Sequence, residues 1–127
     1  MPFKSELVID VLEGLVEHSA GQIQPALAFL EFLEPVSTFE DLLRNSKYNT
    51  CEKLFDYFKT LTNEPAILYA AIKSKDALKV ELVFNKDAWR PWTTRAVLNS
   101  TQEIYEFLLA QGIVLDFNSL INSVKLD

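Results

Sequence analysis

Apolar residues along this chain recur mainly at spacings of three and four, which is the period of an amphipathic helix. A first helix is predicted over about residues 5–18. The acidic side chains occupy one of its faces and the apolar side chains the other: Glu6, Asp10, Glu13 and Glu17 against Leu7, Val8, Val11, Leu12, Leu15 and Val16. The Ser-Ala-Gly tripeptide at residues 19–21 is expected to end this helix.

A second helix is predicted through residues 26–33, and it is apolar on most of its sides. Pro25 fits the first turn of this helix, where a missing N–H has no consequence, and Pro35 must stop it. We expect such a helix to lie centrally in the core. The alternative is that Phe29 and Phe32 dock a partner protein.

Later segments carry the polar patterns that open and close helices. Residues 37–40, Ser-Thr-Phe-Glu, predict a capping box and a short third helix, and residues 49–52, Asn-Thr-Cys-Glu, predict the start of a fourth. Residues 100–103, Ser-Thr-Gln-Glu, predict another start, with Gly112 in the left-handed position beyond the end of that helix. A last short helix is expected from a cap and an apolar spacing near the C-terminus: Asp116, Phe117, Leu120, Ile121 and Val124.

Between residues 65 and 109 the chain repeats itself at an offset of 26 residues. The matching positions are Pro65, Ala70, Ala71, Ser74, Leu78, Leu82 and Val83, which recur as Pro91, Ala96, Val97, Ser100, Ile104, Leu108 and Leu109. We interpret each copy as two helices joined by a turn at the serine. A hairpin of this size cannot bury its apolar stripe alone, so stacking would complete a core and leave an extended surface. Asn-Ser pairs at residues 45–46 and 122–123 indicate either a degenerate extension of the repeat or ordinary turns.

Together these elements predict an all-α fold of short antiparallel helices in a single domain over residues 1–127. Residues 1–62 are expected to form N-terminal helices, and residues 63–127 to stack as helical hairpins in an α-solenoid-like arrangement. A strand in the repeated region would contradict this interpretation.

Residues 96–112 read Ala-Val-Leu-Asn-Ser-Thr-Gln-Glu-Ile-Tyr-Glu-Phe-Leu-Leu-Ala-Gln-Gly, with a Leu-Leu-x-x-Gly ending before a loop. This segment resembles the second half of an ankyrin repeat, and the resemblance covers at most residues 64–127. The Thr-Pro-Leu-His opening of that family is absent, and 26 residues fall short of its repeat of roughly 33. The resemblance implies a degenerate ankyrin-like scaffold for protein partners rather than an enzyme. A set of paired helices of the armadillo or HEAT type fits the composition equally well.

Charge and cysteine content narrow the classes of function. The chain has 127 residues and a net charge of −6, without a basic stripe that could follow phosphates. The single Cys51 cannot form an intramolecular disulfide, and no apolar run approaches the roughly 18–20 residues needed to span a bilayer. We therefore expect a soluble, intracellular protein of the cytoplasm or nucleus, without a secretory signal, that binds neither nucleic acid directly nor membranes.

Candidate chemistry is sparse. His18 is the only histidine and Cys51 the only cysteine, so a zinc site, a Cys-His pair or a Ser-His-Asp triad lacks members. We expect His18 to lie at the C-terminal end of the first helix and Cys51 to fill a small buried space. The carboxylate pairs, Glu31 with Glu34 and Glu40 with Asp41, are interpreted as helix caps or a solvated face. No catalytic residue, metal site or cofactor is predicted.

The most unusual tetrapeptide is Trp89-Arg90-Pro91-Trp92, with Arg95 one helical turn later. Tryptophan and arginine dominate binding hot spots, so these residues are candidates for contacting a partner. The competing interpretation is that one tryptophan packs between hairpins with the arginine over it. The complete candidate set for partner binding is Trp89, Arg90, Trp92, Arg95, Phe29, Phe32, Tyr57 and Tyr105.

These patterns predict a non-catalytic adaptor, assembly or regulatory module that binds a peptide or helix of a partner protein. Three alternatives stay open: a self-associating dimerisation domain, an immunity-like or antitoxin-like inhibitor of a basic protein, and a small enzyme with an unrecognised site. Because residues 126–127 fall where another helix begins or ends, the chain is also compatible with a fragment of a longer protein.

Overall fold

The computed structural model describes residues 5–115, and over that range the chain forms α-helices and short 3₁₀ helices without a strand. This confirms the all-α prediction. The α-helices are α1 (Ser5–Glu17), α2 (Gln24–Leu30), α3 (Pro35–Asn45), α4 (Tyr48–Phe58), α5 (Pro65–Lys73), α6 (Ala77–Val83), α7 (Thr94–Leu98) and α8 (Gln102–Ala110). The 3₁₀ helices are η1 (Lys59–Leu61), η2 (Lys86–Ala88) and η3 (Pro91–Thr93).

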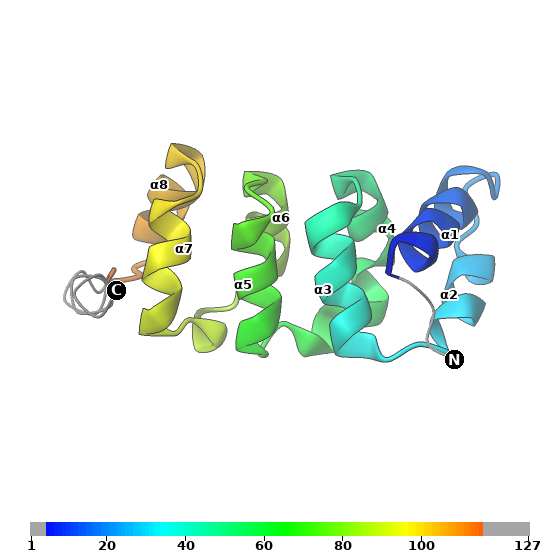
Figure 1. Ribbon diagram of the computed structural model, residues 1–127, viewed down its shortest axis with the longest axis horizontal. Coiled ribbons are helices and arrows are strands. Elements are labelled where there is room, and N and C mark those ends of the chain that lie inside the picture. Colours follow the sequence, from blue (N-terminus) through cyan, green and yellow to red (C-terminus); the bar gives the residue numbers. More distant parts are fainter. Residues whose placement is uncertain (1–4, 116–127) are drawn as a thin grey trace.

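Consecutive helices pair as antiparallel hairpins that stack in chain order (Figure 1). The first helices of three hairpins form one row, in which α3 packs on α5 and α5 on α7. The second helices form a parallel row, in which α4 packs on α6 and α6 on α8. The α1–α2 pair lies at one end of the stack, where α1 contacts both α3 and α4. The same stacking therefore begins N-terminal to residue 63, with the α3–α4 hairpin.

The central helix of the stack is α5, whereas α2 is peripheral. Five of the nine residues of α5 are buried, among them Ala70 and Ala71, because α3, α6 and α7 surround it. Only Ala26 and Leu30 are buried in α2, which packs mainly on α1 at the end of the molecule. The expectation of a central second helix was therefore wrong. An apolar helix at the end of a stack has neighbours on too few sides to be central.

The two predicted copies keep their 26-residue register only as far as the turn. Ser74 and Ser100 both donate their hydroxyl to the carbonyl three residues earlier. Lys75 then adopts a left-handed φ of 63°, and this extra residue moves the register of the following helix to 25. At that offset burial agrees: Val83 and Leu108 are both buried, whereas the sequence had aligned Val83 with the exposed Leu109.

The same register extends to the first hairpin of the stack. Ser46 ends α3 as Ser74 ends α5, and its hydroxyl donates to the Leu42 carbonyl. Two rows of core positions become equivalent: Leu43, Ala71 and Val97 in the first helices, and Leu54, Val83 and Leu108 in the second helices. Between α6 and α8 the rings of Phe84 and Phe107 meet edge to face, 5.4 Å apart.

Two predicted helix starts lie at the wrong residue, and a third is displaced by one. The structure caps α3 with Glu34 rather than with the hydroxyl of Ser37, because Pro35 stands at the first helical position. Helix α4 begins at Tyr48, before the predicted Asn49, and no side chain caps it. Helix α8 is capped by Thr101 rather than by the residue before it.

Other local predictions are confirmed. Residues 19–21 follow α1, with Gly21 at a φ of 82°, and Pro25 lies in the first turn of α2. Gly112 has a φ of 84° just after α8. Its N–H donates to the Leu109 carbonyl and the Ile113 N–H donates to the Leu108 carbonyl, which is the Schellman arrangement.

The Glu34 cap predicts a pH dependence of stability. Its carboxylate accepts from the backbone N–H groups of Ser37 at 2.6 Å and Val36 at 3.1 Å, and these bonds lower the pKa of Glu34. A pKa that is lower in the folded state stabilises the fold at pH values above the unfolded pKa, and that stabilisation disappears as the pH falls through the folded pKa. We expect Glu34→Gln to lower Tm at about pH 6 and to flatten the decline in Tm towards about pH 3.

Thermal unfolding followed by circular dichroism across that pH range measures the effect. The exposed Glu31 lies three residues earlier, and Glu31→Gln removes the same charge without removing a cap. Equal pH profiles for the two variants would contradict the role of Glu34.

Two further predictions concern the ends and the surroundings of the chain. The last helix predicted from Asp116 and the Asn-Ser pair at residues 122–123 lie outside the described residues. Over residues 5–115, none of the helices has both the length and the apolar character needed to cross a membrane.

Candidate functional site

The face formed by the first helices of the hairpins carries a cleft between α5 and α7. Its volume is about 210 Å³, and it is lined by Tyr69, Lys73, Trp92, Arg95, Ala96 and Asn99. Tyr69 and Lys73 lie one helical turn apart on α5, so they share one side of that helix. Trp92 belongs to η3 and Arg95 to α7, and both therefore come from the neighbouring hairpin. We call this group of six residues the aromatic–cationic cleft.

Aromatic rings form its walls. The ring centroids of Tyr69 and Trp92 are 5.2 Å apart, with their planes tilted by 58°. The Lys73 ammonium lies 5.9 Å from the centroid of the Tyr69 ring, within the range of a cation–π interaction. Trp92 is nevertheless 56% exposed, although its neighbours could have covered a ring of this size. The cleft therefore offers a large apolar surface to solvent beside two cations.

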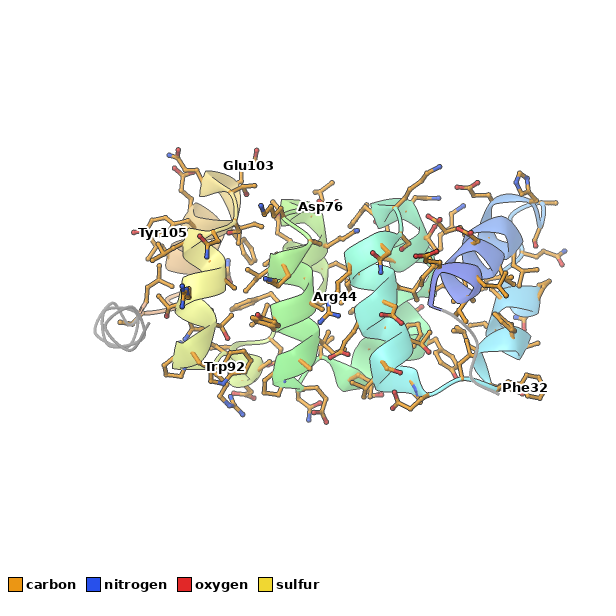
Figure 2. The ribbon with its side chains drawn as sticks, in the orientation of Figure 1. Phe32, Arg44, Asp76, Trp92, Glu103 and Tyr105 are labelled. Atoms are coloured by element: carbon orange, nitrogen blue, oxygen red, sulfur yellow. The ribbon has the colours of Figure 1, made fainter. Side chains whose placement is uncertain are left out.

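The tetrapeptide that stands out in the sequence divides between core and surface. Trp89 is half-buried and packs against the core, whereas Trp92 points outward, at the lower end of α7 in Figure 2. One guanidinium nitrogen of Arg90 donates to the backbone carbonyls of Asp87 and Trp89, both at 2.8 Å. Arg90 thus holds the turn before η3. Of these four candidates, the cleft contains Trp92 and Arg95 only.

The other aromatic candidates are scattered over the molecule. Phe29 and Tyr105 are half-buried and pack against the core. Phe32 is 82% exposed between α2 and α3, at the far end of the stack from the cleft (Figure 2). Tyr57 is on α4 and meets the Phe58 ring edge to face at 4.9 Å. The eight candidate residues therefore do not form one surface.

Sequence analysis missed three members of the cleft, Tyr69, Lys73 and Asn99. Their signal lies in the repeat itself, because stacked hairpins place neighbouring copies side by side. Tyr69 follows Pro65 by four residues and Arg95 follows Pro91 by four, so the two residues are equivalent positions on adjacent helices.

A second and more open cleft of about 430 Å³ lies at the turns that precede α6 and α8. It is lined by Lys75, Asp76, Ala77, Leu78, Glu81, Thr101 and Glu103, so acidic side chains predominate. Asp76 and Glu103 mark its place at the upper edge of the molecule in Figure 2. The carboxylate of Asp76 accepts from the Leu78 N–H at 3.0 Å and thereby caps α6. One of the acidic groups in this cleft therefore has a structural task.

The residues with the greatest chemical potential lie away from both clefts. Cys51 is completely buried, as predicted, and burial raises the pKa of its thiol, although a hydrogen bond with Ser46 and the charge of Lys79 act in the opposite direction. The imidazole of His18 is 81% exposed and lies 4.0 Å from the Glu17 carboxylate. Among residues 5–115, no group of three or more acidic, histidine or cysteine side chains is placed to hold a metal ion.

Lys79 is the one buried cation that the sequence did not reveal. It is only 5% exposed, and its ammonium donates to the carbonyls of Leu43 at 2.9 Å and Ser46 at 2.5 Å. These carbonyls belong to the C-terminal end of α3, where the helix dipole favours a positive charge. Lys79 therefore joins α6 to the preceding hairpin. At the equivalent position of the next hairpin, the chain carries the buried Ile104.

Comparison of this chain with protein families, with curated proteins and with solved structures gave no match.

Proposed function

We propose that this protein is a non-catalytic protein-binding module that holds a peptide or helix of a partner on the face formed by α3, α5 and α7. The observation that supports the proposal is the aromatic–cationic cleft on that face. Tryptophan, tyrosine and arginine are the side chains that contribute most to binding hot spots, and here they come from two adjacent hairpins.

The size and lining of the cleft favour binding over chemistry. A volume of about 210 Å³ is smaller than the roughly 300–1,000 Å³ of typical small-molecule sites. Its lining contains no carboxylate, histidine or cysteine that could act as a general base or nucleophile. A cleft of this kind suits one or two side chains of a larger ligand, as expected for part of a protein interface.

We expect Trp92→Ala to weaken binding of the partner by about tenfold or more, since truncation of a hot-spot tryptophan removes about 2 kcal/mol or more of binding free energy. Quantitative affinity capture from the native lysate identifies the partner, and titration calorimetry with that purified partner then measures Kd. Phe32→Ala is the matched control, because it also removes an exposed aromatic ring but at the other end of the stack.

Each result of this comparison has a clear meaning, provided that circular dichroism shows both variants to be folded. A loss of affinity in Trp92→Ala alone supports the proposed face. A loss in Phe32→Ala alone would place the interface at the α2–α3 end and contradict the proposal. Light scattering over a range of concentrations tests the alternative in which the partner is a second copy of this chain.

The acidic cleft favours a second candidate function, the neutralisation of a basic protein. Asp76, Glu81 and Glu103 lie together at its rim, in a chain whose net charge is −6. Electrostatic attraction of this kind accelerates association and weakens steeply with salt. Salt-sensitive capture of a cationic protein that is lost in the Glu81→Gln/Glu103→Gln double variant, but retained in Trp92→Ala, would favour this candidate.

The resemblance to ankyrin repeats stays a prediction. What it implies, a scaffold for protein partners, is part of the same proposal.

A further inference from the structure

The aromatic–cationic cleft differs in charge from the rest of the protein. The whole chain carries a net charge of −6, yet the cleft lining contains two cations, Lys73 and Arg95, and no acidic side chain. Both cations are exposed. Within residues 5–115, no carboxylate forms an ion pair with Lys73. The local charge of the cleft is therefore positive on an acidic protein.

We propose that this cleft binds an acidic segment of the partner, with a glutamate or aspartate carboxylate between Lys73 and Arg95 and an apolar neighbour against Trp92. This inference rests on the function proposed above and names the chemistry of the ligand. Arginine presents a planar fork of donors that matches a carboxylate, and lysine adds a compact positive charge.

The aromatic walls strengthen the attraction for a carboxylate. Because the Tyr69 ring lies beside the Lys73 ammonium and against the Trp92 ring, a bound segment would exclude water from one side of the charges. Charge pairs attract more strongly as water is removed from around them. The amide of Asn99, at the same cleft, supplies a further N–H donor.

The exposed ring of Trp92 gives the segment its second requirement. A ring with more than half of its surface in solvent buries apolar area when a leucine or phenylalanine packs on it. The ligand is therefore a segment in which acidic and apolar residues alternate, rather than a uniformly acidic chain. A basic segment would meet like charges at Lys73 and Arg95.

Two pools of synthetic peptides test the inference with the full chain. Both consist of N-acetylated, C-amidated nonapeptides with leucine, phenylalanine or alanine at alternate positions; the positions between them carry glutamate in one pool and glutamine in the other. Binding is followed by the NMR signals of the indole N–H groups. Trp92 reports on the cleft, and Trp89, which does not line the cleft, is the internal control.

We expect the glutamate pool to shift the Trp92 signal far more than the Trp89 signal, and to bind about tenfold more tightly than the glutamine pool. Raising the salt concentration from about 50 mM to about 300 mM should reduce this preference, because exposed charges are screened. The Lys73→Gln/Arg95→Gln double variant should abolish the preference while leaving weak apolar binding.

Lys53→Gln/Lys59→Gln is the matched control, since it removes two exposed cations from α4 and η1 and should leave the preference intact. Circular dichroism checks that each variant is folded. Equal binding of the two pools, or no saturable binding of the glutamate pool, would overturn the acidic-segment inference. The proposed function has its own test, because partner binding that depends on Trp92 but involves no acidic segment would retain the module and remove only this inference.

Discussion

Phe39→Ala is expected to lower the free energy of unfolding by about 3–5 kcal/mol, which is the usual cost of removing a buried aromatic ring. Phe39 lies on α3 and Phe58 at the end of α4, and both are completely buried. Their rings stack with centroids 4.6 Å apart and planes only 6° from parallel. Removing one ring leaves a cavity between the two helices and unstacks the other ring. Since domains of this size are stable by about 5–15 kcal/mol, a large share of the stability depends on this pair.

Urea unfolding followed by circular dichroism measures this change. The matched control is Phe32→Ala, where an 82% exposed ring is removed and the expected change stays within about 0.5 kcal/mol. A Phe39→Ala variant as stable as Phe32→Ala would show that the α3–α4 hairpin does not depend on its aromatic pair.

The second large effect is expected at Lys79. Lys79→Met keeps an unbranched side chain of similar length but removes the donor that serves the Leu43 and Ser46 carbonyls. Hydrogen bonds to a charged group contribute about 1.5–3 kcal/mol, and the two carbonyls would be left partly unsatisfied at a buried helix end. We expect a loss of about that size. Lys79→Ala should lose more, because the packing of the aliphatic stem disappears as well.

Chemical unfolding gives the free energy, and the rate of modification of the Cys51 thiol reports on the site itself. Cys51 contacts Ser46 at 3.3 Å and lies in the same buried group, so opening this region should expose it. Lys53→Met, at an exposed position on α4, controls for the loss of a charge. If Lys79→Met is as stable as the wild type, this position tolerates an apolar side chain as the next hairpin does at Ile104, and the lysine is not an essential cap.

Local sequence signals succeed where the chain has one way to satisfy its backbone. Gly112 is such a case, because a left-handed residue after α8 requires glycine, and the structure has the expected φ of 84° there. They fail where two polar residues compete for one cap. Glu34 and Ser37 can both cap a helix, and Pro35 decides between them by starting the helix two residues earlier than expected. The proline that ends one helix can therefore begin the next.

The register of the repeat shows a similar division. Pro65, Ser74 and their partners 26 residues later were recognised because they occupy equivalent turns. The single left-handed residue Lys75 was invisible, since lysine has no preference for that conformation and nothing nearby in the sequence requires it. The shift in the second helices could be seen only from which side chains are buried.

The sequence by itself determined that this chain is helical, where most of its helices lie, and that Cys51 is buried, because these properties depend on spacing, on proline and glycine, and on apolar content within short segments. Only the tertiary structure decided that Lys79 is buried against another helix, that Trp89 packs inward while Trp92 stays exposed, and that Trp92 meets Tyr69 and Lys73. These contacts join residues of different hairpins. Such residues become neighbours only when the stacking geometry is set, and no local pattern encodes that geometry.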